Sequence, residues 1–122
     1  MPIASAADHA APEISYPVVI IGGGACGLTA ALAARDAGAD VLVIERDPVP
    51  RGTTAMSTGL IPAAGTPDQA AAGIIDTPAL LATDIVAKTK GRTDPDIALR
   101  LPEESAETVV WLRDQHAVPL SL

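Results

Sequence analysis

The sequence predicts an α/β fold, in which one parallel βαβ unit with an incomplete sheet is followed by several helices. The apolar run at residues 18–21 is short and continuous, as is typical of a strand buried on both sheet faces. Three glycines in G-x-G-x-x-G spacing follow it directly, and a second apolar run at residues 41–44 ends on Glu45. Strand, glycine turn, helix, strand and terminal acid together define a Rossmann-like unit.

The boundaries of this unit follow from local signals. The strands are expected at residues 17–21 and 41–45, and the helix between them at residues 25–38. Gly38 stands near the end of the helix as a stop signal. A parallel pair joined by a helix requires a right-handed crossover.

Each glycine of the motif has its own predicted role. Gly22 allows the tight turn, Gly24 lets the backbone approach a pyrophosphate, and Gly27 lets the helix pack closely on the strand. Ala25 and Cys26 open the helix, whose unpaired N–H groups and positive dipole end attract phosphate. We interpret Cys26 as a small residue that tolerates close packing, because no second cysteine exists to resolve an oxidised thiol.

The two residues that end the second strand suggest which dinucleotide is bound. Glu45 is placed to accept hydrogen bonds from ribose hydroxyls, and its charge would repel a 2′-phosphate. NAD and FAD are therefore favoured over NADP. Arg46 could neutralise a phosphate, although a solvated surface arginine fits the sequence equally well.

The rest of the chain is predicted to be mainly helical. Residues 1–16 are expected to form a flexible leader, and Pro48 and Pro50 indicate a loop over residues 46–52. Residues 60–61 could form a short third strand. Helices are expected at residues 70–75, 78–89 and 95–101, with a last one starting at residue 102.

Composition excludes several classes of partner. The 122 residues carry a net charge of −7, which argues against nucleic acid and anionic membranes as partners. No stretch resembles a signal peptide or a membrane span. The single cysteine fits a reducing compartment, so a cytoplasmic location is expected.

Residues 18–46 and 51–66 together resemble the start of the FAD-dependent oxidoreductases of the fumarate reductase/succinate dehydrogenase flavoprotein type, which include 3-ketosteroid dehydrogenases. The first glycine motif is shared with many flavoproteins, whereas the second stretch, with its glycine, hydroxyl residues and S-x-G-hydrophobic pattern, is more specific. Residues 76–90 and 94–112 are also similar to this family. The resemblance implies FAD as the cofactor.

The resemblance also implies a set of cofactor-binding residues. The glycine turn would contact the pyrophosphate, Glu45 the adenosine ribose, and the second stretch the pyrophosphate, ribityl and flavin portions. The predicted cofactor-binding residues are Gly22, Gly24, Ala25, Cys26, Gly27, Glu45, Arg46, Gly52, Thr53, Thr54, Ser57 and Gly59. No catalytic or metal-binding residue is assigned, since His9 and His116 match no family position and Arg100 and Arg113 are expected to be solvated.

The predicted function is the FAD-binding portion of an oxidoreductase that transfers hydride between flavin and a C=C or CH–CH group of a small molecule. Residues 17–122 would form a partial FAD-binding domain, truncated before the substrate-capping domain. Two alternatives remain at this point: an NAD-binding Rossmann module, and a non-catalytic fragment that by itself is marginally stable and binds FAD weakly or not at all. The oligomeric state is left unassigned.

Overall fold

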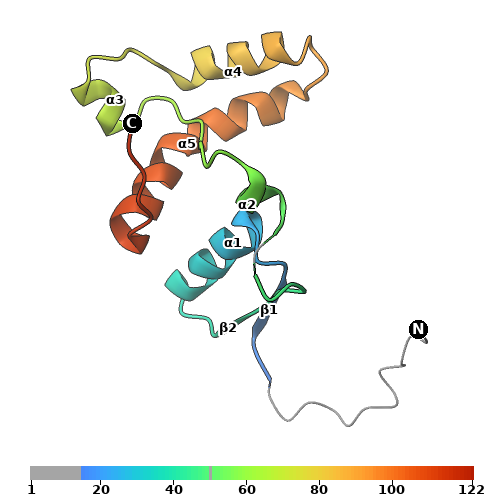
Figure 1. Ribbon diagram of the computed structural model, residues 1–122. Helices are drawn as coiled ribbons and strands as arrows, with labels where there is room; N and C mark the ends of the chain where they lie inside the picture. The colour runs from blue at the N-terminus through green and yellow to red at the C-terminus, as the bar shows by residue number, and fades with distance from the viewer. Residues whose placement is uncertain (1–14, 50) are drawn as a thin grey trace. The chain divides into compact units, whose positions relative to one another are not determined.

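The computed structural model describes residues 15–49 and 51–122 (Figure 1). Most of the predicted leader, at residues 1–16, lies outside the described residues. The chain divides into two compact units, the first ending at Gly59 and the second beginning at Leu60. Each unit is described by itself.

The first unit is the predicted βαβ unit. Its elements are the strand β1 (Val18–Ile21), the helix α1 (Ala25–Asp36), the strand β2 (Val41–Ile44) and the short helix α2 (Thr53–Met56). The strands pair in parallel, from Val18 opposite Val41 to Ile21 opposite Ile44. The α/β prediction and the order of the first three elements are therefore confirmed.

The sheet differs from the prediction in two respects. Side chains along β1 alternate between half-buried and exposed, and Ile21 is 88% exposed, so the strand is not buried on both faces. The reason is that α1 covers one face only, where Gly27 approaches Ile20. The expected third strand was also wrong: residues 60–61 are irregular, and the described residues contain a two-stranded sheet.

The second unit is helical, with α3 (Pro67–Ala71), α4 (Pro78–Lys88) and α5 (Pro95–His116). Helix α4 starts where residues 78–89 were expected to be helical, and Thr77 caps it by accepting a hydrogen bond from the Leu80 N–H. Asp94 caps α5 in the same way, accepting from the N–H groups of the second and third helical residues. Local capping signals thus located both helix starts correctly.

Helix α5 corrects the prediction of two separate helices at residues 95–101 and from residue 102. The helix continues through Pro102, which cannot donate a backbone hydrogen bond and costs about 3 kcal/mol inside a helix. Pro102 is fully buried, and Ala98 and Ser105 on the same helix face are buried with it. Leu101, the residue before Pro102, has no side-chain oxygen that could cap a new helix. Burial of the face formed by Ala98, Pro102 and Ser105 offsets the free-energy cost of the proline.

The short helix α3 starts earlier than the predicted residues 70–75. A capping box fixes its start: Thr66 accepts a hydrogen bond from the Gln69 N–H, and the Gln69 side chain accepts from the Thr66 N–H. Both residues are buried. The T-x-x-Q pattern of residues 66–69 is the local signal for this helix start.

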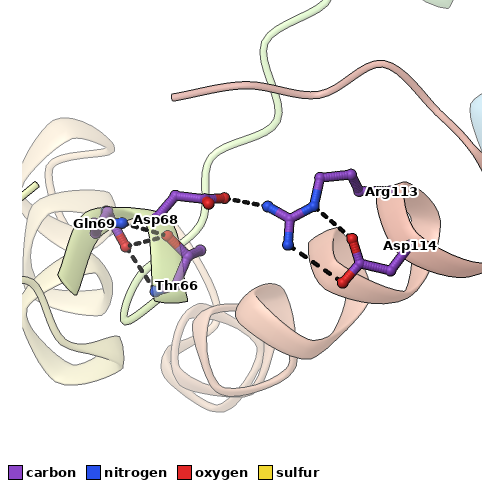
Figure 2. Close-up of polar contacts among 5 residues, drawn as sticks. All are labelled: Thr66, Asp68, Gln69, Arg113 and Asp114. Carbon is purple, nitrogen blue, oxygen red and sulfur yellow. Dashed lines mark hydrogen bonds and ion pairs between the residues drawn. The ribbon is translucent and has the colours of Figure 1, made fainter. Parts of the chain in front are cut away.

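Polar contacts link distant segments inside the second unit. Ser105 on α5 accepts a hydrogen bond from the Ala64 N–H at 3.1 Å. Figure 2 shows Arg113 on α5 between two carboxylates, with one nitrogen toward Asp68 on α3 and two toward Asp114. Arg113 was expected to be solvated, but its side chain is only 29% exposed and ion-paired, so that expectation was wrong. No helix in the described part of the chain has both the length and the apolarity needed to cross a bilayer.

Candidate functional site

The glycine turn between β1 and α1 has the conformation that its sequence requires. Gly22 has φ of +107°, a value that side chains disfavour, and its N–H donates to the Ile44 carbonyl at 2.7 Å. A Cβ added at Gly27 would lie 2.0 Å from the Gly22 carbonyl oxygen. The first and third glycines are therefore required by backbone geometry, as predicted.

Glu45 lies against this turn, immediately after β2. One carboxylate oxygen accepts a hydrogen bond from the Gly23 N–H at 2.7 Å, and the other accepts from the Asp47 N–H at 3.1 Å. These two amide contacts, with a smaller contribution from Arg46, hold the pKa of the Glu45 carboxyl below its ordinary value. The acid is thus kept ionised beside the turn, as a group that accepts hydrogen bonds.

Thr54 joins the second glycine-containing stretch, of which residues 51–59 belong to the first unit, to the start of α1. Its hydroxyl oxygen accepts a hydrogen bond from the N–H of Ala25, the first residue of α1, at 3.0 Å. Gly24, the N-cap residue of α1, provides no side-chain cap of its own. The hydroxyl therefore satisfies one of the N–H groups that a helix leaves unpaired at its start.

These segments surround one cavity of about 600 Å³ within the first unit. Five of the predicted residues line it, namely Gly24, Glu45, Arg46, Gly52 and Thr54. The lining also includes five residues that sequence reasoning did not assign to the site: Gly23, Leu28, Asp47, Arg51 and Ala55. Gly23 could have been found as the middle member of the glycine triplet, whereas the others carry no local signal.

The remaining predicted residues lie near the cavity without lining it. Gly22 belongs to the glycine turn, and Ala25 and Gly27 lie in the first turn of α1. Ser57 donates a hydrogen bond to the Thr54 carbonyl and accepts one from the Gly59 N–H, so it orders the end of the second stretch. Thr53 opens α2. Cys26 is exposed, which corrects its interpretation as a closely packed residue.

The basic side chains near the cavity differ in their partners. Arg46 is 90% exposed and pairs with Asp47 at 3.2 Å. Arg51 also lines the cavity. In the second unit, Arg100 is largely exposed and lies 3.7 Å from Glu103, and His116 contacts the Trp111 ring edge to face.

The cavity suits the adenosine diphosphate part of a dinucleotide. Its volume falls within the range of small-molecule sites. A Cβ added at Gly52 would meet nothing within 4 Å, and one at Gly24 would meet only the Thr54 hydroxyl at 3.5 Å. The backbone at both glycines is therefore open to close approach by a ligand, beside an acid and the start of a helix.

Known proteins are similar to this chain in sequence and fold. The family model described as FAD binding domain matches residues 17–122. The chain is 36% identical over 107 residues to a cytochrome-type fumarate reductase of Shewanella frigidimarina, a match that covers 88% of this chain and 19% of the relative. It is 35% identical over 108 residues to the NADH:fumarate oxidoreductase of Klebsiella pneumoniae, covering 88% and 12% respectively. The chain thus spans less than a fifth of the length of these relatives.

Solved structures agree with the family match. A 3-ketosteroid-Δ4-(5α)-dehydrogenase from Rhodococcus jostii has a TM-score of 0.77 and 36% identity, with 90% of this chain and 23% of that one covered. The open form of a flavocytochrome c3 fumarate reductase has a TM-score of 0.76 and 32% identity, with 84% and 18% covered. The chain therefore belongs to the FAD-binding domain family of the fumarate reductase/succinate dehydrogenase flavoproteins, in which the cofactor is FAD rather than NAD.

Proposed function

We propose that this chain holds the adenosine diphosphate half of FAD within a flavin-dependent oxidoreductase acting on a small molecule. The observation that carries the proposal is the convergence of three segments on one cavity: the glycine turn, the acid after β2 and the stretch around Thr54. These segments bring backbone N–H groups, a carboxylate and a hydroxyl together, and each has a matching group in ADP.

In this proposal, Glu45 binds the adenosine ribose. Each of its carboxylate oxygens already accepts one amide hydrogen bond, yet each keeps a further acceptor position for a ribose hydroxyl. The amides at Gly23 and Asp47 therefore orient the acid without using up its capacity. The lowered pKa of Glu45 keeps it in the form that accepts such hydrogen bonds at neutral pH.

The backbone at Gly24 and Gly52 would lie along the pyrophosphate, because neither position carries a side chain to exclude it. Arg46 and Arg51 line the cavity and add positive charge near the two phosphates. Thr53, Ser57 and Gly59 would extend toward the ribityl and flavin portions. The remaining predicted residues, Gly22, Ala25, Cys26 and Gly27, would shape the turn and the helix start.

When bound, FAD supplies hydride transfer between the flavin and a C=C or CH–CH group. The names of the relatives, fumarate reductase and 3-ketosteroid dehydrogenase, support small-molecule substrates of this kind for the whole protein. The cytoplasmic location stays part of the proposal and rests on the single cysteine.

Titration of FAD with the purified chain tests the proposal through quenching of flavin fluorescence, with NAD as a competitor. We expect FAD to bind and excess NAD to leave it bound. Glu45→Ala should weaken FAD binding roughly tenfold, the size typical of hydrogen bonds to a charged group. The matched control Glu103→Ala removes an exposed acid on α5 and should leave the affinity unchanged. Absence of FAD binding, with or without binding of NAD, would reject the proposal.

A further inference from the structure

Two neighbouring contacts tie three segments of the first unit together. The Gly23 N–H donates to Glu45, and the Ala25 N–H, two residues later, donates to Thr54. One contact joins the glycine turn to the end of β2, and the other joins it to the second stretch. Both contacts join groups of the chain itself and hold the three segments around the cavity.

We infer that Thr54 is a positioning residue that fastens the second stretch to the start of α1 and so prepares the cavity for FAD. This inference rests on the proposed function. A hydroxyl can accept and donate at once, so accepting from Ala25 leaves the Thr54 O–H free to donate. Thr54 thereby fixes the stretch without removing a donor from the site.

The placement of Thr54 supports this role over a purely local one. Its oxygen lies 3.0 Å from the Ala25 nitrogen, although the two residues are 29 positions apart. Within its own stretch, the Thr54 carbonyl accepts hydrogen bonds from the N–H and the hydroxyl of Ser57. The side chain of Thr54 thus contacts α1, while its backbone carbonyl orders the end of α2. One residue therefore links α1 and α2.

A competing role for the Thr54 hydroxyl would have the opposite effect on FAD affinity. The Thr54 hydroxyl occupies an N–H group that a phosphate oxygen could otherwise use, because helix starts bind anions. If the phosphate must displace the hydroxyl, removing the hydroxyl strengthens FAD binding. If the hydroxyl positions the second stretch, removing it weakens FAD binding. Affinity measurements with Thr54 variants therefore separate the two.

The experiment compares the unsubstituted chain with Thr54→Val and Thr54→Ser in binding of FAD and of AMP. Valine keeps the shape but loses the acceptor, and serine keeps the acceptor. We expect Thr54→Val to bind FAD roughly fivefold more weakly, the scale of one helix-capping contact, and Thr54→Ser to restore most of the affinity. AMP keeps the ribose contact with Glu45 but carries only one of the two phosphates placed beside the second stretch, so its affinity should fall less than that of FAD.

The matched control is Thr58→Val, which removes a hydroxyl outside the cavity lining on the same stretch and should not alter FAD affinity. Equal or tighter FAD binding by Thr54→Val would overturn the inference. Equal losses for FAD and AMP would also overturn it, because they would indicate general damage to the fold.

Hydrogen exchange of the Ala25 amide by NMR provides a second readout in the unsubstituted chain, which needs no variant to fold. We expect exchange slower than the intrinsic rate of an unbonded amide, and exchange at that rate would overturn the inference. If the amide is protected but the chain binds no FAD, the proposed function fails and the cofactor role of Thr54 fails with it. If FAD binds but Thr54→Val binds it equally well, only the inference about Thr54 fails.

Discussion

Most of the buried residues of this chain lie in one unit, and the candidate site lies in the other. In the first unit, which ends at Gly59, Ala31 is the one described hydrophobic residue that is buried. The second unit, from Leu60, buries a larger set of side chains: Ala64, Thr66, Gln69, Ala98, Pro102, Ser105 and Leu112. Yet every residue that lines the candidate cofactor cavity belongs to the first unit.

In the described residues, the site is therefore not surrounded by a large buried core. Hydrogen bonds from backbone N–H groups to Glu45 and Thr54 hold the exposed segments of the first unit in place. In the second unit, burial of apolar side chains and hydrogen bonds between buried polar groups hold the segments in place. We therefore expect some substitutions to remove cofactor binding without destabilising the helices of the second unit. Others should destabilise those helices without changing cofactor binding.

The largest expected effect is that of Gly27→Ala on the first unit. The added methyl group would lie 2.0 Å from the Gly22 carbonyl oxygen, so the turn or the helix must move. We expect destabilisation of the first unit by about 3 kcal/mol and loss of FAD binding. Amide exchange along β1 and β2 measures the first unit, and fluorescence of Trp111, the single tryptophan, follows the second.

The control for this change is Gly52→Ala, at a glycine with an ordinary φ of −71° and open space around an added Cβ. We expect it to cost less than about 1 kcal/mol in stability. If Gly27→Ala leaves the exchange rates of both strands unchanged, the close approach of turn and helix is not present in solution.

Gln69→Ala is the opposite test, because it acts on the second unit. The side chain is buried, accepts from the Thr66 N–H, and donates to the Ala63 carbonyl and to Asp76. Truncation leaves buried polar groups without partners, so we expect a loss of about 2 kcal/mol in the free energy of unfolding. Denaturant unfolding followed by Trp111 fluorescence measures it.

FAD affinity should be unaffected by Gln69→Ala, which distinguishes the second unit from the first. Gln115→Ala, which truncates an exposed glutamine on α5, is the matched control and should change stability by less than about 0.5 kcal/mol. A drop in FAD affinity as large as that of Glu45→Ala would show that the division between core and site is not real.

The smallest expected effect is the pH dependence of Glu45. Because hydrogen bonds from Gly23 and Asp47 lower its pKa in the folded state, its charged form stabilises the turn above the ordinary value of 4.5. That stabilisation is lost as the pH falls below 4.5 and through the lowered pKa. The amide proton shift of Gly23, followed by NMR, should titrate with a midpoint below 4.5 and show no such step in Glu45→Gln. A midpoint at or above 4.5 contradicts the contact.

The sequence predicted the bounds of both strands in the first unit to within a residue or two, because the signals that define these strands are local. Apolar runs, glycine spacing and the terminal acid each act within a few residues, and the caps at Thr77 and Asp94 do the same. The resemblance of the second stretch to known flavoproteins then identified the FAD-binding family, which the family match confirmed. Local signals alone supported only a dinucleotide.

The features that could not be predicted depend on contacts between distant positions. The proline rule indicates a helix boundary at Pro102, but burial together with Ala98 and Ser105 keeps α5 continuous. The ion pair between Arg113 and Asp68 joins residues 45 positions apart. Thr54 was assigned to the cofactor, whereas its contact with Ala25 could be found only from the structure.

The parallel pairing of β1 and β2 also bears on the kinetics of folding. No tight turn can join parallel strands, so Val18 meets Val41 only after the whole of α1 has been traversed. The helices α4 and α5 are adjacent along the chain and contact each other across a short connection. Since contacts between distant positions form more slowly than local ones, we expect the helices to acquire protection from hydrogen exchange early in refolding and the two strands late. Pulse-labelling during refolding would reveal that order, with the cofactor cavity completed last.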